Sequence, residues 1–458
     1  MVLFGVAPGA QAARALHIGF FDSVFRAGAD ADPWLDRTVA LAGDVVRIDV
    51  GWPAPQGAAP PVGFDARDPA DPQYDFSNAD AAIVAARSRG LQVLASFTGA
   101  PPWAEGPGRP ASADPGTWKP SPKALEDYGA ALARRYSGRF PDPARPGHVL
   151  PNVKALQVWN EPNLATYLTP QWKGRSAASP AMYRQMLTAF YRGVKSVPSK
   201  IAVVTAGTGP FGDAQPGGRR VQPVRFWREL LCLRAIGRRL GTRSCPAPAR
   251  FDVLAHHPYS VGQPRRKAIN ADDASIPDIG KLTRLLRKAE STGRALPRKR
   301  HGVWVTETSY DSKPPDPFGV PALTHARWLQ EAFYLLWRQG VDTITWFQIR
   351  DQLPEPSYAA TNQSGVFLAD GRAKLAARAF RFPLVAERAG ATGLRVWGRS
   401  PLAGSLKIER RVAGGWRTLR TSQVARNATF FVRVPRAAAP DRLRARVGDA
   451  TSLVWRAG

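Results

Sequence analysis

Two glutamates each follow an apolar run of the sequence, in surroundings that suggest chemistry rather than packing. Glu161 stands in the segment Trp-Asn-Glu-Pro-Asn at the end of one run, and Glu307 follows the run GVWVT. A charge at the end of a buried strand is unfavourable unless it is paired or has a function. Two carboxyl groups held near each other can act as nucleophile and general acid, because different environments give them different pKa values.

Further polar and aromatic residues lie in the later parts of other apolar runs or just beyond them. These residues are Arg47, Asp49, Trp103, Asn160, His256, His257, Tyr259, Tyr310, Trp346 and Gln348. So many functional groups at the ends of strands are hard to explain as packing. His256 and His257 are neighbours in one run, and neighbouring strand residues point to opposite faces. We therefore expect only one of them to face the site, which argues against a metal site made by this pair.

Eight runs have the length and composition of buried strands, and helical patterns lie between them. The runs cover residues 16–22, 45–52, 91–98, 153–160, 201–208, 251–259, 302–310 and 341–349. The helical patterns begin near Asn78, Ser121, Ser179, Asp278 and Thr324, and residues 364–380 lead into a last helix. Apolar strands that alternate with helices predict a parallel sheet that is buried on both faces. Eight such units predict a (β/α)8 TIM barrel, in which the C-terminal ends of the strands form the rim that carries active sites.

Four motifs at these strand ends resemble those of the clan A glycoside hydrolases, which are retaining (β/α)8-barrel glycosidases. The motifs are RIDVGW, WNEPN, HPY and VTET, and the resemblance covers about residues 16 to 385, with families five and thirty-nine as the most similar members. By this resemblance Glu161 is the acid/base and Glu307 is the nucleophile. Asn160 would bind the 2-hydroxyl of the sugar, Arg47 and Tyr259 would hold the nucleophile, and His257 would belong to the same shell.

The chemistry of such a reaction requires the same set of groups. Cleavage with retention needs two carboxyl groups about 5–5.5 Å apart, one to attack the anomeric carbon and one to protonate the leaving oxygen. The nucleophile must stay ionised, which an adjacent Arg and a Tyr hydroxyl favour, whereas the acid needs a raised pKa, which burial favours. Trp103 and Trp346 are candidates to stack on sugar rings. Asp49, Gln348 and Tyr310 are further candidates for substrate contact, and neither a metal nor a cofactor is expected.

The C-terminal part of the chain has a different character. From Leu394 it contains about six short alternating runs, which predict a small antiparallel β-sandwich. We therefore divide the chain into a signal-like segment 1–15, a catalytic barrel 16–388 and an all-β domain 389–458. Residues 394–458 carry 14 Lys and Arg but only 3 Asp and Glu. This charge has two interpretations, a solvated structural domain or a module that docks on an anionic cell-wall polymer.

Features of an exported protein are present but incomplete. Residues 1–15 resemble the end of a secretory signal with small residues before a cleavage site, although the positive segment is missing; an ordinary N-terminus is the alternative. The two cysteines, Cys232 and Cys245, are expected to form a disulfide. No apolar run is long enough for a membrane helix. We therefore expect a secreted protein, and a monomer.

The composition and motifs lead to one functional hypothesis with alternatives. The net charge of +28 raises nucleic acid as a partner, but no recognition module is evident, so nucleic-acid binding is not expected. We expect a retaining glycosidase that hydrolyses O-glycosidic bonds in a polysaccharide or glycoconjugate. A transglycosylase would use the same residues. A carbohydrate-binding barrel without activity is a second alternative, which the intact set of Glu161, Glu307, Asn160 and Arg47 disfavours.

Overall fold

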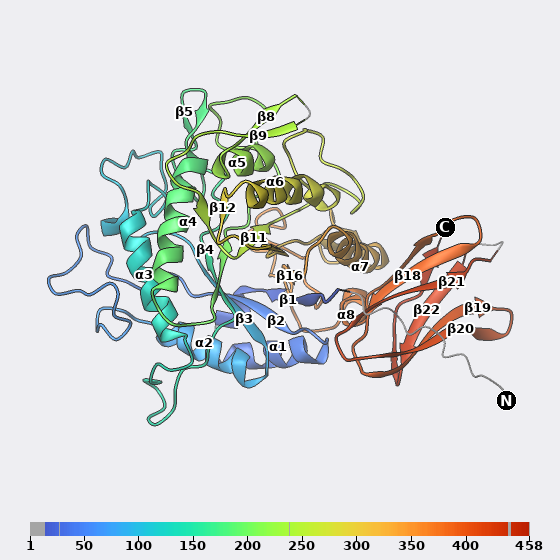
Figure 1. Cartoon of the computed structure of the whole chain (residues 1–458). Helices are drawn as coiled ribbons and strands as arrows, with labels where there is room; N and C mark the ends of the chain where they lie inside the picture. The colour runs from blue at the N-terminus through green and yellow to red at the C-terminus, as the bar shows by residue number, and fades with distance from the viewer. Residues whose placement is uncertain (1–13, 27, 238, 438–440, 458) are drawn as a thin grey trace, which may run out of the picture.

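The computed structural model describes residues 14–26, 28–237, 239–437 and 441–457. Its larger part is a closed barrel of eight parallel strands (Figure 1). Each strand lies beside its predecessor and successor of the predicted series, in the order β1-β16-β13-β11-β7-β4-β3-β2. The strands are β1 His17–Phe21, β2 Val45–Asp49, β3 Gln92–Phe97, β4 Ala155–Val158, β7 Ala202–Thr205, β11 Val253–His256, β13 Gly302–Val305 and β16 Thr343–Trp346. The predicted TIM barrel is confirmed.

Helices surround the barrel, and each predicted helix is present. They are α1 Gly28–Ala40, α2 Ser77–Ser88, α3 Pro122–Arg135, α4 Ser179–Lys195, α5 Pro223–Leu230, α6 Ile279–Ser291, α7 Ala322–Arg338 and α8 Leu375–Arg381. Ser121 caps α3 as its sequence suggested, because its hydroxyl accepts a hydrogen bond from the backbone N–H of Ala124 at 3.3 Å. Two helices, α1 and α5, were not predicted; α1 contains Pro33, and α5 has only eight residues.

The barrel strands are buried on both faces, which explains their continuous apolar runs. Strands β4, β11 and β16 have no exposed residue. A separate cluster of buried residues comes from β3, β4, β7, β11 and β13, and its members are Leu94, Ala155, Val204, Val253, Ala255 and Trp304. The outward-facing residues join the main core beneath the helices. Apolar packing therefore holds the strands in place, and the polar residues that could take part in catalysis lie at the C-terminal ends of the strands.

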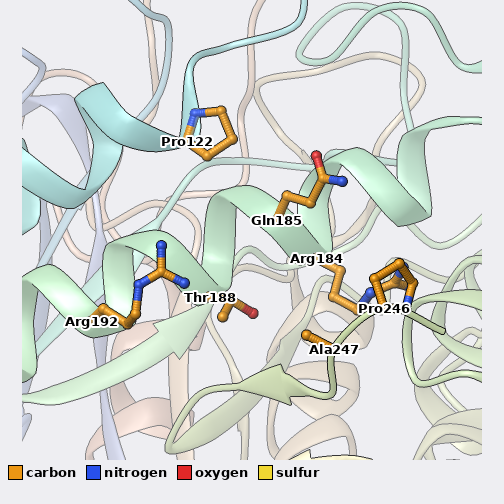
Figure 2. A pocket seen from close by; sticks show the side chains of 7 residues that line it. All are labelled: Pro122, Arg184, Gln185, Thr188, Arg192, Pro246 and Ala247. Carbon is orange, nitrogen blue, oxygen red and sulfur yellow. The ribbon is translucent and has the colours of Figure 1, made fainter.

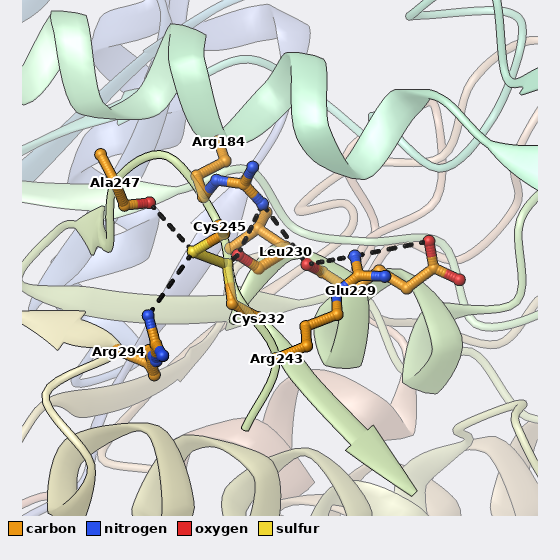
Figure 3. The surroundings of a disulfide bond; sticks show 8 residues. All are labelled: Arg184, Glu229, Leu230, Cys232, Arg243, Cys245, Ala247 and Arg294. Carbon is orange, nitrogen blue, oxygen red and sulfur yellow. Dashed lines mark hydrogen bonds and ion pairs between the residues drawn. A yellow bond between two sulfur atoms is a disulfide. The ribbon is translucent and has the colours of Figure 1, made fainter. Parts of the chain in front are cut away.

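The predicted disulfide joins Cys232 to Cys245, with 6.0 Å between their Cα atoms (Figure 3). Between the two cysteines lies a hairpin of β8 Leu233–Ile236 and β9 Arg239–Thr242. Buried Arg184 of α4 donates hydrogen bonds to the carbonyl groups of Glu229 and Leu230 beside the disulfide. The disulfide thus connects the end of α5 to the segment that leads into β11.

Residues 384–437 and 441–457 form the predicted β-sandwich (Figure 1). One sheet has three strands, β17 Leu384–Arg388, β18 Gly393–Arg399 and β21 Thr429–Pro435. The other contains β19 Gly404–Val412, β20 Gly415–Val424, β22 Asp441–Val447, β23 Ala450–Thr451 and β24 Trp455–Ala457. The sequence division had placed residues 384–388 in the barrel, but they pair with β18 as an antiparallel strand.

The three-stranded sheet packs against the barrel. Trp397 of β18 contacts the rings of Tyr334 and Trp337 on α7. Arg399 is fully buried in the interface and donates hydrogen bonds to the carbonyls of Leu16 and Ala42. The five-stranded sheet is the layer farther from the barrel (Figure 1).

Two further expectations from the sequence concern export and membrane insertion. Most of the signal-like segment 1–15 lies outside the described residues, so the structure does not test it. Among the described helices, none has the length and apolar character required to cross a bilayer.

Candidate active site

The turn after β4 holds its residues in unusual backbone conformations. Trp159 has φ of 77° and Glu161 has φ of 33°, both in the left-handed region that side chains other than Gly rarely adopt. Surrounding contacts maintain the turn. The indole N–H of buried Trp159 donates to the carbonyl of Tyr167 at 2.8 Å, and the N–H of Glu161 donates to the carbonyl of Gly207 at 3.0 Å. Strain of this kind is typical of functional sites, where the surrounding structure has to impose it.

Glu161 lies in a largely dry environment. Its side chain is 13% exposed, and His257 Nδ1 lies 3.0 Å from its Oε1. Burial raises the pKa of Glu161 to about 7, against a smaller opposing effect from the charge of Arg47. This carboxyl group can therefore hold a proton near neutral pH and can also release it.

Glu307 has a different environment on the same rim. The hydroxyl of Tyr259 donates to Oε1 at 2.6 Å, and the guanidinium of Arg47 lies 3.3 Å from Oε2. Burial, with the charge of Glu307, raises the pKa of Tyr259 well above its usual value, so the phenol keeps the proton that it donates. Glu307 thus accepts a hydrogen bond from Tyr259 and faces the positive charge of Arg47 at 3.3 Å, whereas the side chain of Glu161 contacts His257.

The two carboxylates are close together. His257 Nδ1 lies 3.0 Å from Oε1 of Glu161 and 3.9 Å from Oε2 of Glu307. These two oxygens can be no farther apart than the sum of those distances. That limit is consistent with the separation of about 5–5.5 Å between the carboxyl groups of retaining glycosidases.

Arg47 connects the groups of the site from β2. It is 3% exposed, and its Nη2 donates to Asn160 Oδ1 at 3.0 Å, while Nη1 donates to the carbonyl of Thr306 at 3.1 Å. Its guanidinium carbon lies 4.0 Å from the ring centroid of Phe21. A buried guanidinium with this many partners is fixed in place, and it fixes Asn160 and Glu307 in turn.

His257 bridges the two carboxylates rather than accompanying Glu307 alone, as the resemblance had implied. Burial lowers its pKa to about 4, so it is neutral at neutral pH. Gln157 Nε2 donates to Thr306 Oγ1 at 2.9 Å, which leaves the Thr306 hydroxyl to donate to His257 Nε2 at 3.0 Å. With Nε2 as an acceptor, Nδ1 carries the ring proton and donates it to Glu161.

Gly207 is required by the close approach of His257. A Cβ atom at position 207 would lie 2.0 Å from His257 Nε2, so only glycine fits against this ring. The neighbouring His256 points the other way, as strand alternation predicted. Its Nδ1 contacts the hydroxyl of Thr208 at 2.8 Å, and its Nε2 donates to the carbonyl of Ala274 at 2.8 Å. Among the described residues, no cluster of His, Cys, Asp and Glu has the composition to hold a metal ion.

The structure brings together the six residues to which the resemblance assigned roles, but it places the other candidates differently. Trp346 was expected to stack on a sugar, yet it is fully buried and its indole N–H donates to the carbonyl of Ser364 at 2.8 Å. This expectation is therefore wrong, because the ring is packed among core side chains. Gln348 is also buried, at 1% exposure. Tyr310 is 8% exposed and packs against Trp328 and Trp346.

The two remaining candidates lie on the rim with structural partners. Asp49 forms an ion pair with Arg26 and accepts a hydrogen bond from the N–H of Gly51 at 3.1 Å. Trp103 is half-buried, donates to the carbonyl of Pro55 at 2.9 Å and packs edge-on against Trp52. Trp103 therefore keeps part of its surface available to a ligand, whereas Asp49 already has partners.

Three aromatic residues at the site, Tyr167, Phe347 and Phe21, were not predicted from the sequence. Tyr167 hydrogen-bonds Asn160, and burial together with the charges of Glu161 and Glu307 raises its pKa to about 12. Phe347 follows β16, is half-buried and lies 5.4 Å from Phe21 between ring centroids. Since Phe347 has the opposite orientation to Trp346 along the strand, alternation could have indicated which aromatic residue faces the rim.

A separate cavity of about 260 Å³ lies beside α4 (Figure 2), and two residues that line it, Arg184 and Ala247, also surround the disulfide (Figure 3). Its described lining residues include Arg184, Gln185 and Thr188 of α4, and none of them carries a carboxyl group. It therefore lacks the paired acids of the rim and is a different place in the molecule.

Comparison with known proteins gives a match in fold but not in sequence. No family model matches the chain, and no curated protein matches it. Among solved structures, a family 39 glycoside hydrolase from Bacteroides cellulosilyticus WH2 has a TM-score of 0.53 and 17% identity, covering 92% of this chain and 81% of that one. This likeness shows a shared fold.

Two further similar structures have lower scores. SrfJ from Salmonella typhimurium has a TM-score of 0.49 and 12% identity, covering 94% of this chain and 91% of that chain. A GH30 endoxylanase from Clostridium papyrosolvens C71 has a TM-score of 0.46 and 12% identity, covering 93% and 98%.

Proposed function

We propose that this protein is a retaining glycoside hydrolase that cleaves O-glycosidic bonds in a polysaccharide or glycoconjugate. The observation that carries the proposal is the pair of close carboxyl groups in unlike environments. Burial raises the pKa of Glu161 to about 7, while Glu307 accepts a hydrogen bond from Tyr259 and faces Arg47. Such a pair suits a double displacement, in which one group attacks and the other transfers protons.

In the first step of the proposed mechanism, the carboxylate of Glu307 attacks the anomeric carbon of the bound sugar. The bond from that carbon to the leaving oxygen breaks, and the proton of Glu161 passes to this oxygen. The products are a free alcohol, a glycosyl ester on Glu307 and an ionised Glu161. His257 donates Nδ1–H to the carboxylate that forms on Glu161, and so stabilises it.

In the second step, Glu161 acts as a base. It takes a proton from water, the water oxygen bonds to the anomeric carbon, and the bond to Glu307 breaks. Two displacements on the same carbon restore its original configuration, and both carboxyl groups return to their initial states. The pKa of Glu161 of about 7 is suited to both tasks, because neither protonation state is strongly disfavoured near neutral pH.

Asn160 is the proposed contact to the sugar's 2-hydroxyl. Its Oδ1 is occupied by Arg47 at 3.0 Å, which fixes the orientation of the amide. Its Nδ2 group then faces away from Arg47 and near Tyr167, where a hydroxyl oxygen can accept from it. Partly exposed Trp103 is the proposed aromatic contact farther out on the rim.

Localisation outside the cytosol is part of the proposal. The Cys232–Cys245 disulfide supports it, because structural disulfides persist in oxidising compartments. A polymeric or glycoconjugate substrate outside the cell is consistent with this location.

The test is a screen of aryl glycosides and of plant and bacterial cell-wall polysaccharides for release of aglycone or reducing sugar. For any substrate that is cleaved, proton NMR at early times identifies the first anomer released. We expect the anomer with retained configuration. Inversion would overturn the mechanism, and absence of cleavage of every substrate by protein shown to be folded and oxidised would overturn the assignment.

A further inference from the structure

The outer face of the five-stranded sheet of the C-terminal domain carries an unusual set of side chains. Residues directly opposite each other on neighbouring strands point to the same side. In β19 and β22, Leu406, Ile408 and Ala445 point into the sandwich, so the residues that alternate with them point outward. We call this outward set the cationic face, and its members are Lys407, Glu409, Arg411, Trp416, Arg442, Arg444, Arg446 and Arg456.

The charges of the cationic face are largely uncompensated. Its one carboxylate, Glu409, is 5% exposed and is occupied by Arg444 at 2.7 Å. Within the described part of the chain, the other five cations of the face form no ion pair. On the barrel, by contrast, many exposed arginines are paired; Arg192 with Glu126 and Arg265 with Glu331 are examples. Scattered surface charge does not account for this concentration on one sheet face.

The strand register places like charges directly opposite each other. Lys407 lies opposite Arg446, and Arg442 lies opposite Arg456. Directly opposed like charges destabilise an antiparallel sheet, whereas one opposed glutamate in each pair would stabilise it. The arrangement is thus unfavourable for the isolated domain and becomes favourable when an anion lies across the strands. The three-stranded sheet lies between this sheet and the barrel (Figure 1), and within the described part of the chain Arg411, Arg442 and Arg456 of the cationic face are exposed.

We propose that the cationic face binds an acidic polysaccharide that bears carboxylate or sulfate groups. The choice of a polysaccharide among polyanions rests on the proposed function of the barrel and on the neighbours of the face. Thr418, Thr421 and Gln423 of β20 are exposed beside it, and their hydroxyl and amide groups suit sugar hydroxyls. Single-stranded nucleic acid needs open aromatic platforms, but the ring of Trp416 is covered by Arg444 at 4.1 Å.

Binding at this face would concentrate the barrel on its polymer. The two domains are joined by a buried interface that includes Trp397 and Arg399, so the attachment is not a flexible tether. A rigid second contact raises the effective concentration of the barrel at the polymer surface without any change in the catalytic rim. The effect should therefore be seen with polymers and not with small soluble glycosides.

The register also offers a variant that should fold. In the double variant Arg442→Glu and Arg446→Glu, each new glutamate lies opposite a cation, Arg456 or Lys407. Both like-charge pairs become opposite-charge pairs, so we expect thermal stability equal to or above that of the unmodified protein. The matched control is Arg284→Glu and Arg298→Glu, which makes the same charge change at exposed barrel positions.

Binding is measured at low salt and in a salt series on polygalacturonate and heparin, with dextran as the neutral polymer. Duplex DNA and phosphatidylserine vesicles are the other polyanions. We expect salt-sensitive binding to at least one acidic polysaccharide, weakened at least about tenfold in the double variant and less than about twofold in the control. Equal binding by the double variant, no binding to either acidic polysaccharide, or tighter binding to DNA or vesicles would overturn the proposal. Cleavage of a small aryl glycoside, measured in parallel, should be unchanged and reports separately on the barrel.

Discussion

His257 Nδ1 lies 3.0 Å from Glu161 Oε1, and this contact joins the proposed acid/base to a chain of buried hydrogen bonds. Behind the ring, Thr306 contacts Nε2 at 3.0 Å and in turn accepts a hydrogen bond from Gln157. Burial lowers the pKa of His257 to about 4, so the imidazole is neutral and carries one ring proton. The hydrogen-bond partners of the two ring nitrogens determine which nitrogen holds that proton. The protonation of Glu161 thus depends on residues that cannot touch a substrate.

Glu161→Gln should stabilise the protein at alkaline pH. Burial raises the pKa of Glu161 from 4.5 to about 7, so its contribution to stability is fully present below pH 4.5 and is lost as pH rises through about 7. The variant lacks this loss. We expect it to exceed the unmodified protein at pH 8 by up to roughly 3 kcal/mol, with the difference vanishing toward pH 4.5.

The measurement is chemical unfolding at several pH values, with Glu355→Gln as a control at an exposed glutamate. A stability difference that does not change between pH 5 and pH 8 would show that Glu161 titrates normally in the folded protein.

Thr306→Val should raise the pKa of Glu161 further. Without the Thr306 hydroxyl, His257 Nε2 loses a donor, and the tautomer that donates Nδ1–H to the carboxylate is less favoured. A carboxylate with fewer donors is harder to form, so the alkaline limb of kcat/KM should move upward by about half to one pH unit.

Thr345→Val is the matched control for this change. Thr345 is equally buried and donates to the carbonyl of Thr306 at 2.7 Å, but it does not contact His257. Similar pH profiles for the two variants would mean that the chain from Thr306 through His257 does not position the proton of Glu161.

The sequence predicted the barrel well because each strand is buried on both faces, and such a strand forms a continuous apolar run in the sequence. It also predicted that Arg47, Glu161 and Glu307 belong to the rim, since Glu161 and Glu307 follow the ends of β4 and β13 and Arg47 interrupts the apolar residues of β2. It could not predict contacts across the barrel. Gln157 of β4 and Thr306 after β13 are 149 residues apart in the sequence and meet only because the sheet closes into a barrel, so no local pattern indicates their contact.

Other errors have local causes. The apolar run at 341–349 extends past the end of β16 at Trp346, so the reading gave Trp346 and Phe347 no distinct orientation. The more conspicuous tryptophan was chosen, although it lies in the core. Residues 384–388 were assigned to the barrel because they follow its last helix directly. Only their pairing with β18 shows that they belong to the C-terminal domain, and the sequence does not reveal which strands pair.

Removal of the disulfide should weaken the fold but leave the site intact. Cys232 and Cys245 are 13 residues apart, and closing a loop of this size contributes about 3 kcal/mol. The double variant Cys232→Ala and Cys245→Ala should therefore lose up to that amount in chemical unfolding while it keeps its activity at 25 °C. Reduction of the unmodified protein should have the same effect, and detection of two free thiols in the oxidised, denatured protein would contradict the bond.

Substitution of each carboxyl group by alanine should distinguish the two roles. Glu307→Ala should form no glycosyl-enzyme with any substrate, because the attacking group is missing. Glu161→Ala should still react with an aryl glycoside whose leaving group needs little protonation, and should then stall, because no base activates the water.

Azide, which needs no base, should rescue Glu161→Ala and give a glycosyl azide of retained configuration. With Glu307→Ala, azide can attack only from the empty side of the missing nucleophile, and any glycosyl azide formed should have inverted configuration. NMR of the isolated azides checks both expectations. A glycosyl azide of retained configuration from Glu307→Ala, together with one of inverted configuration from Glu161→Ala, would show that Glu161 is the nucleophile and Glu307 the acid/base. In that case Tyr259 and Arg47 would be expected to contact Glu161. The structure instead places both of those groups on Glu307, at 2.6 Å and 3.3 Å.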